Sequence, residues 1–216
     1  MKTDEQLQVD VLEELRWEPT VTASEIGVSV SKGVVMLTGT VSTYAEKCAA
    51  ERAVRRVAGV QAIAEEIRVK LTGIHQRSDE EVAQTLERAL QSHVWVPSDV
   101  QATVENGWVT LGGEVTWQFQ RKAATNVARF LAGVKGVTNR ITIRPRELDA
   151  KVEKSIDQAL KRNADIDAKG ITVSAYRGKA TLSGNVRTFA DRDRIERVVW
   201  NAPGVVAIEN KLIVLW

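Results

Sequence analysis

The sequence has little cysteine, little histidine and no long apolar run, and each shortage excludes a class of protein. A single cysteine, Cys48, among 216 residues rules out an intrachain disulfide. His75 and His93 lack Cys, Asp or Glu partners at the spacing of a zinc site, so both are expected to be exposed. No apolar stretch reaches the roughly 18 residues of a membrane-spanning helix, so we expect no transmembrane segment. The net charge of +2 argues against a dedicated nucleic-acid-binding protein.

The composition and the N-terminal stretch narrow the compartment and the number of domains. An apolar fraction of 44% and a charged fraction of 27% are ordinary for a globular chain, and the length suits two or three domains. The stretch MKTDEQLQVDVLEELRWEP is charged throughout and has no apolar core of a signal peptide. We therefore expect a cytoplasmic protein if Met1 is the native start, and a periplasmic one if the chain was trimmed there.

A nine-residue segment occurs three times in the chain. It reads GVVMLTGTV at 33–41, GWVTLGGEV at 107–115 and GKATLSGNV at 178–186. The second glycines of these segments are 74 and then 71 residues apart. Repetition of this kind predicts three tandem copies of a unit of about seventy residues, each large enough to be a small domain. The predicted domains are 1–73, 77–145 and 148–216.

Each copy has the same succession of hydrophobic patterns. An apolar stripe at helical spacing comes first, as in Leu7, Val11 and Leu15. Two alternating runs follow and predict strands joined by a tight turn, for which Asn106-Gly107 is the strongest signal. A second stripe and a final Ile/Val-rich run complete the order helix–strand–strand–helix–strand. We therefore expect an α+β fold of three tandem small domains, each with a three-stranded mixed sheet and both helices on one face.

Two glycines in each nine-residue segment have predicted structural roles. The first is expected to form the hairpin turn, and the second to end the strand where the chain turns toward the second helix. A nucleotide-binding loop is not indicated, because no GxGxxG or GxxxxGK[ST] spacing is present. The six structural glycines are Gly33, Gly39, Gly107, Gly113, Gly178 and Gly184.

These motifs resemble the BON domain (bacterial OsmY and nodulation). The resemblance covers nearly the whole chain as three copies. It implies a non-enzymatic module linked to osmotic or envelope stress, for which phospholipid or other ligand binding is proposed, with no catalytic site. Many members of this family are exported or are envelope lipoproteins. The matching residues are the three nine-residue segments and the later pairs Gly59-Val60, Gly133-Val134 and Gly204-Val205.

The start of the second helix departs from the repeat in the second copy. Thr43 and Thr188, each with an acid three residues later, suit helix N-caps, whereas the second copy has Trp117 there. Aromatic and basic residues at a helix start suit a membrane interface or a partner. The alternative is that Trp117 packs against a neighbouring copy. The candidate residues for lipid or partner binding at this place are Trp117, Phe119, Arg121 and Lys122.

The third copy has the largest excess of basic over acidic residues. Arg187, Arg192 and Arg194, at its second helix, are candidates for attracting anionic lipid. The alternative is a solvated helix face with paired charges, because Asp191 and Glu196 interleave with these arginines.

The single cysteine belongs to the second helix of the first copy. Cys48 corresponds to Lys122 and Asp193 in the other copies, so we expect it to be exposed or at the rim of the helix. A nucleophilic thiolate needs a nearby base and a lowered pKa, and the sequence indicates neither. We therefore expect no catalytic role for Cys48.

The leading hypothesis is a non-enzymatic binding or scaffolding protein of the osmotic or envelope stress response. Its partner would be anionic phospholipid or another protein. The alternatives are a bound small ion, such as potassium, and a protein–protein assembly module. No repeat-equivalent position offers a histidine, a cysteine or paired acids, so we expect no enzyme, no metal site and no cofactor.

Overall fold

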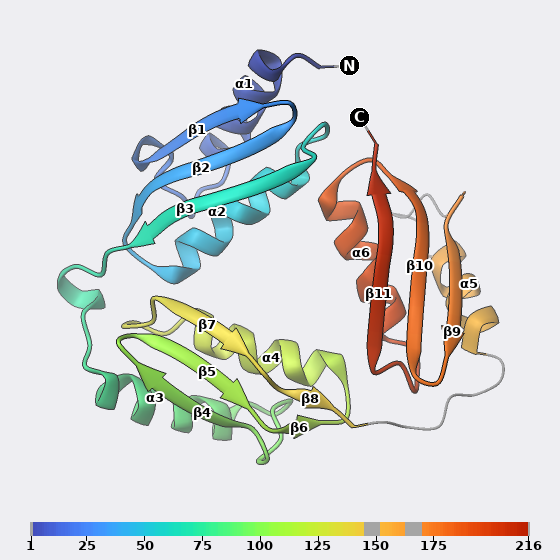
Figure 1. The fold of residues 1–216 in the computed structure, drawn as a ribbon. Helices are drawn as coiled ribbons and strands as arrows, with labels where there is room; N and C mark the ends of the chain where they lie inside the picture. The colour runs from blue at the N-terminus through green and yellow to red at the C-terminus, as the bar shows by residue number, and fades with distance from the viewer. Residues whose placement is uncertain (1, 145–151, 163–169, 216) are drawn as a thin grey trace.

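The computed structural model describes residues 2–144, 152–162 and 170–215, which form three units of one design (Figure 1). Each unit contains a first helix, a hairpin, a second helix and a last strand that joins the hairpin. The predicted α+β class and the order of elements are therefore confirmed. The predicted domain limits at 145 and 148 lie outside the described residues and stay a prediction.

Unit 1 starts with a capped amphipathic helix. The Thr3 hydroxyl accepts a hydrogen bond from the Gln6 N–H and the Gln6 side chain accepts one from the Thr3 N–H, which forms the predicted capping box. Leu7, Val11 and Leu15 are buried against the sheet at helical spacing. The elements of unit 1 are α1 (Asp4–Arg16), the 3-10 turn η1 (Ala23–Glu25), β1 (Ile26–Ser31), β2 (Val34–Val41), α2 (Tyr44–Arg56) and β3 (Ala62–Val69).

Units 2 and 3 repeat this plan after a linker that contains the 3-10 turn η2 (Gly73–His75). The middle and last strands of unit 2 are each divided in two. The elements of unit 2 are α3 (Asp79–Ser92), β4 (Gln101–Glu105), β5 (Trp108–Gly112), β6 (Glu114–Val115), α4 (Gln118–Arg129), β7 (Gly136–Asn139) and β8 (Thr142–Ile143). Those of unit 3 are α5 (Val152–Arg162), β9 (Thr172–Tyr176), β10 (Lys179–Val186), α6 (Phe189–Trp200) and β11 (Ala207–Val214).

The hairpin turn has the same geometry in every unit. The second hairpin strand is central in its sheet, antiparallel to the first strand and parallel to the last. Both central residues of the turn have positive φ, as at Asn106 (54°) and Gly107 (79°). This is the type I′ geometry that matches the right-handed twist of the strands.

The second glycine of the repeated segment does not end the strand in units 1 and 3, contrary to the prediction, whereas in unit 2 the strand is interrupted at Gly113, between β5 and β6. β2 and β10 continue for two residues beyond Gly39 and Gly184. Gly39 has a φ of 130°, and a Cβ atom there would lie 2.1 Å from the Glu25 carbonyl oxygen. The position requires glycine because the preceding segment approaches the strand too closely for a side chain.

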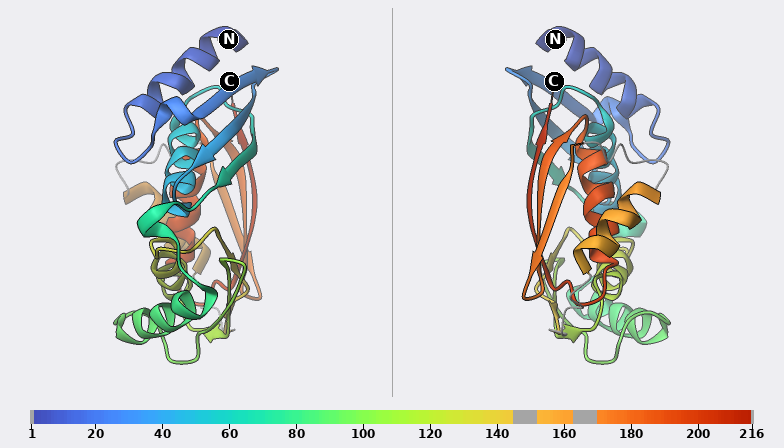
Figure 2. Two further views of the ribbon diagram at one scale, coloured as in Figure 1. Left: turned by 90° about the vertical axis from the view of Figure 1, so that its left-hand side faces the viewer. Right: turned by 90° about the vertical axis from the view of Figure 1, so that its right-hand side faces the viewer.

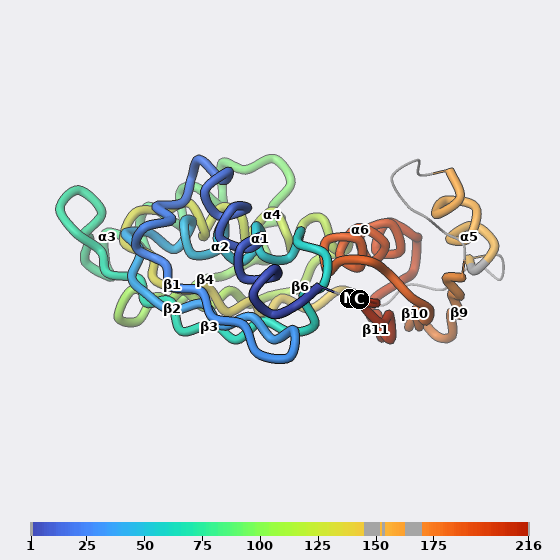
Figure 3. Tube along the Cα trace, turned by 90° about the horizontal axis from the view of Figure 1, so that it is seen from above, coloured from blue at the N-terminus to red at the C-terminus, as the bar shows by residue number. Residues whose placement is uncertain are grey.

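Each unit has its own hydrophobic core between its sheet and its two helices. In Figure 2 the three sheets lie on one side of the molecule and the helices on the other. The view from above shows the same two layers, with the ends of the chain close together (Figure 3). The second helix of each unit lies toward the middle of the arrangement in Figure 1.

The units contact one another through equivalent positions of their second helices. Tyr44 of unit 1 packs against the core of unit 2, and Phe189 of unit 3 packs against the core of unit 1. The Arg55 guanidinium lies over the Phe189 ring at 5.3 Å and donates two hydrogen bonds, of 2.8 and 2.6 Å, to the Asp193 carboxylate. The units therefore follow one another around the middle in a head-to-tail order.

Cys48 is buried at this contact, so the predicted exposed position is wrong. Burial raises the pKa of its thiol, and Arg129 of unit 2 only partly opposes that effect. The reason for the error is that the outer face of α2 packs toward a neighbouring unit. A buried thiol of raised pKa is a poor nucleophile.

Candidate functional site

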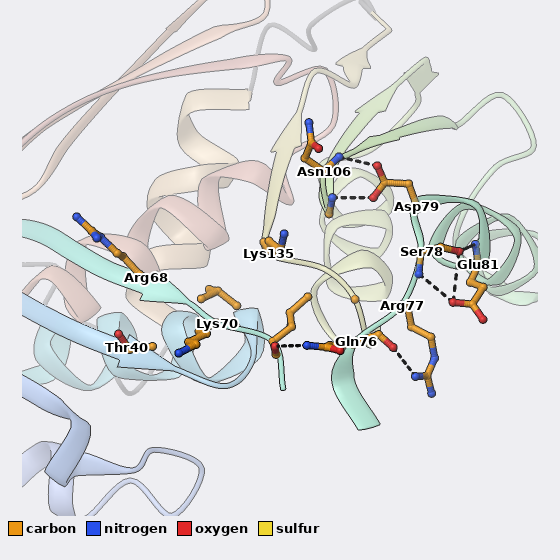
Figure 4. A pocket seen from close by; sticks show the side chains of 14 residues that line it. Thr40, Arg68, Lys70, Gln76, Arg77, Ser78, Asp79, Glu81, Asn106 and Lys135 are labelled. Carbon is orange, nitrogen blue, oxygen red and sulfur yellow. Dashed lines mark hydrogen bonds between the residues drawn. The ribbon is translucent and has the colours of Figure 1, made fainter. Parts of the chain in front are cut away.

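A large pocket lies between units 1 and 2 and is lined by cationic side chains (Figure 4). Its volume is about 950 Å³, within the range of small-molecule sites. Arg68 and Lys70 come from the end of β3 and the residue after it, Arg77 from the linker, and Lys135 from the approach to β7. We call this pocket the cationic corner.

Two acids also line the cationic corner, but both are bound to backbone groups. The Asp79 carboxylate accepts hydrogen bonds of 2.6 and 2.8 Å from the N–H groups of Asn106 and Gly107. The Glu81 carboxylate accepts a bond of 2.9 Å from the Ser78 N–H in the predicted capping box. Figure 4 shows both carboxylates turned toward these partners. They hold the first helix against the hairpin and form part of the pocket wall.

An equivalent pocket of about 620 Å³ lies where units 3 and 1 meet, next to both ends of the chain. We call it the terminal corner. Asp4 takes the place of Asp79 and accepts hydrogen bonds from the N–H groups of Lys32 and Gly33, of 2.7 and 3.0 Å. These two bonds lower the pKa of Asp4. An aspartate that accepts hydrogen bonds from both N–H groups of the hairpin turn is thus repeated in units 1 and 2. The sequence reasoning missed this feature.

The opposite end of unit 2 exposes three apolar side chains. Val94 and Trp95 lie in the loop after α3 and are 88% and 60% exposed, and Phe119 in the first turn of α4 is 47% exposed. The Trp95 and Phe119 rings meet edge to face at 6.2 Å. We call Val94, Trp95 and Phe119 the apolar tip. The sequence reasoning missed Trp95, although an aromatic residue between two valines in HVWVP, outside any periodic pattern, was a usable signal.

The four residues predicted at the start of α4 do not gather on one surface. Trp117 is half-buried, and its backbone N–H donates a hydrogen bond of 3.0 Å to the Gln120 side-chain oxygen. Arg121 is half-buried and donates to Asn139 at 3.4 Å. Lys122 is exposed, and its partial burial, followed by the charges of Arg197 of unit 3 and Arg129, lowers the pKa of its ammonium group. Only Phe119 belongs to the apolar tip.

The three arginines predicted in unit 3 are also separated. Arg187 lines the terminal corner. Arg192 donates a hydrogen bond of 3.0 Å to the Asn210 carbonyl oxygen. Arg194 forms an ion pair of 3.5 Å with Asp191, one turn away. Each arginine therefore lies in a different environment, and the paired-charge alternative describes Arg194.

The described residues offer neither a cluster of metal ligands nor a membrane-spanning helix. Residues 2–144, 152–162 and 170–215 contain no group of three or more His, Cys, Asp or Glu side chains placed to hold a metal ion. Within these ranges no helix combines the length and the apolar character needed to cross a bilayer.

Comparisons with known proteins find relatives in bacteria. The chain is 26% identical to osmotically-inducible protein Y of Escherichia coli (strain K12) over 143 residues, which is 62% of this chain and 71% of that protein. Two solved structures of CdsD, a structural protein of the type III secretion system of Chlamydia trachomatis, are also similar. Their identities are 19% and 18%, and both TM-scores are 0.27. The first alignment covers 96% of this chain and 91% of that one, and the second covers both chains fully.

The family comparison covers all three units. The model of the BON domain matches residues 3–70, 78–145 and 148–215, which is nearly the whole chain. The repeat, the fold and this match agree, and the chain belongs to the BON domain family.

Proposed function

We propose that this chain is a non-enzymatic binding protein of the osmotic or envelope stress response that docks on anionic phospholipid through the apolar tip. The name of the Escherichia coli relative, osmotically-inducible protein Y, supports the link to osmotic stress. The observation that supports membrane docking is the exposure of Val94, Trp95 and Phe119 side by side at one end of unit 2.

Such a tip suits the boundary between lipid headgroups and acyl chains. The transfer of tryptophan and phenylalanine side chains from water to this boundary lowers the free energy, and tryptophan is enriched there. The neighbouring helix start favours an anionic surface, because the first turn of α4 has no acidic residue to offset its positive dipole end. Trp17, 84% exposed, lies in the equivalent loop of unit 1, where Ala45 replaces Phe119, so the aromatic pair of the apolar tip is not repeated in that unit.

The test is co-sedimentation with vesicles of phosphatidylcholine alone and of phosphatidylcholine mixed with phosphatidylglycerol. We expect binding to the mixed vesicles and a loss of about tenfold in partitioning for Trp95→Ala with Phe119→Ala. Trp17→Ala is the matched control and should bind like the unchanged chain. Absence of binding at low salt, or an equal loss in the control, would refute docking through the tip and turn attention to a protein partner.

A further inference from the structure

We propose that the cationic corner binds a small anion that carries two or more phosphate groups. This site is distinct from the apolar tip. The hairpin turn lies at one end of the strands of unit 2, whereas the loop before β4 and the start of α4 lie at the other end. The proposal therefore does not depend on membrane docking.

The cationic corner carries more positive than negative charge. Within the part of the chain that the structure describes, Arg68, Lys70 and Lys135 form no ion pair within 4.0 Å, and all three are exposed. The Arg77 guanidinium donates a hydrogen bond of 2.6 Å to the Gln76 carbonyl oxygen. This bond is to a neutral group, and no acid among the described residues forms an ion pair with Arg77 within 4.0 Å. These four cations outnumber the two acids that line the pocket, Asp79 and Glu81, and an excess of positive charge around one hollow concentrates anions from solution.

The terminal corner has the same architecture as the cationic corner with different side chains. Ile213, Leu215 and Gln61 occupy the positions of Arg68, Lys70 and Lys135. Lys2, at the position of Arg77, also lines that pocket, as do Lys32 and Arg187 from other positions. The contact between two units therefore forms without cations at these three positions. The fold does not require cations at these three positions, so we assign the charges of Arg68, Lys70 and Lys135 to a ligand.

The chemistry of the side chains specifies the ligand class. Arginine offers a planar fork of N–H donors that matches phosphate oxygens, and lysine adds a compact charge. The cations come from both sides of a pocket of about 950 Å³, so one phosphate group would not reach all of them. A ligand with two or more phosphate groups would contact both units and hold them together. Its source is either a free phosphorylated molecule or a phosphorylated lipid headgroup.

Isothermal titration calorimetry with inorganic pyrophosphate at low salt tests the free source. We expect saturable binding that weakens as salt is added, and a loss of about tenfold in affinity for Lys70→Gln with Lys135→Gln. The charge-matched control is Lys154→Gln with Arg162→Gln on α5, which removes two exposed cations outside the pocket. Lys70→Arg with Lys135→Arg should retain binding, which shows that the charge rather than the fold was lost.

The lipid source is tested in the Trp95→Ala, Phe119→Ala background, so that docking through the tip does not contribute. Vesicles that contain cardiolipin, whose headgroup carries two phosphate groups, are added to this variant with and without Lys70→Gln and Lys135→Gln. Vesicle binding that the glutamine pair removes, without pyrophosphate binding, would support the site and identify a headgroup as its ligand. The proposal is overturned if neither pyrophosphate nor vesicles bind, or if the glutamine pair and the α5 control bind as tightly as each other.

Discussion

The two ends of unit 2 offer opposite surfaces although one sheet and two helices connect them. The hairpin end faces unit 1 and carries Lys135 among the cations of the cationic corner. The other end exposes Val94, Trp95 and Phe119 and contains no acidic residue in the first turn of α4. Unit 1 has the same elements, but Gln61 replaces Lys135 and Ala45 replaces Phe119.

This difference teaches which positions of the repeat serve the fold and which serve binding. The glycines at the turns and the acid that grips the hairpin recur in units 1 and 2 with the same geometry. Lys135 and Phe119, at which unit 2 differs from unit 1, are exposed, and a substitution at an exposed position costs little stability. We infer that divergence at the ends of a constant scaffold gave unit 2 its two surfaces.

The largest expected effect is the loss of stability caused by Gly113→Ala, a substitution at the end of unit 2 that carries the apolar tip. Gly113 has a φ of 112°, and a Cβ atom there would lie 2.2 Å from the Asp99 carbonyl oxygen. We expect this substitution to destabilise the chain by about 3 kcal/mol or more, measured by urea unfolding. Gly112→Ala is the neighbouring control, because a Cβ atom there meets nothing within 4 Å. Equal effects of the two substitutions would contradict the role given to Gly113.

The hairpin end should respond to Asp79→Ala. This change removes the acceptor of the Asn106 and Gly107 N–H groups, and we expect a loss of about 2 kcal/mol in the free energy of unfolding. Glu80→Ala, in the same helical turn, should change stability by less than about 0.5 kcal/mol. A comparable loss of unfolding free energy at both positions would mean that the hydrogen bonds of Asp79 to the turn are not what stabilises this end.

The contact between units 1 and 3 lies at neither end of unit 2 and should affect neither surface. A double-mutant cycle of Arg55→Ala and Asp193→Ala should give a coupling of about 0.5–1 kcal/mol, because the pair is bidentate but partly exposed. Binding of vesicles and of pyrophosphate should stay unchanged in the folded variants. A loss of either activity would show that the surfaces depend on the arrangement of the units.

The smallest expected effect concerns the contact between units 1 and 2. Burial, followed by the neighbouring Cys48, raises the pKa of Tyr44 to about 12. The folded chain therefore keeps this proton where the unfolded chain loses it. This difference in proton binding stabilises the folded chain. The resulting contribution to the free energy of unfolding is fully present below the ordinary tyrosine pKa of about 10 and is lost as the pH rises toward 12.

Tyrosinate absorbance in the near ultraviolet measures this titration. A late step should be present in the unchanged chain and in Tyr176→Phe, and absent in Tyr44→Phe. If Tyr44→Phe keeps the late step, Tyr44 does not lie in the buried contact described above.

The fold could be predicted from the sequence because its signals are local. Apolar stripes, the Asn106-Gly107 turn and the capping residues Thr3 and Ser78 each act within a few residues of chain. The threefold recurrence of these signals made the order of elements certain even where one copy was weak. The role of Gly39 escaped prediction because it depends on Glu25, which approaches from a different segment.

The binding surfaces were harder to predict, because they depend on how segments and units meet. Phe119 was identified from its departure from the repeat, but its neighbour Trp95 comes from a loop without periodicity. Lys70 and Lys135 are distant in sequence and face one pocket only because two units pack together. The same packing buries Cys48, which the comparison of copies had placed at an exposed rim.

The most direct test of two separate surfaces on unit 2 is backbone amide NMR of the isotope-labelled full chain. Pyrophosphate and nanodiscs that contain phosphatidylglycerol are added in separate titrations. We expect pyrophosphate to shift the amides of Asn106, Gly107 and Lys135, and nanodiscs to broaden those of Val94, Trp95 and Phe119. Perturbation of the same amides by both ligands, or of neither set, would contradict the account.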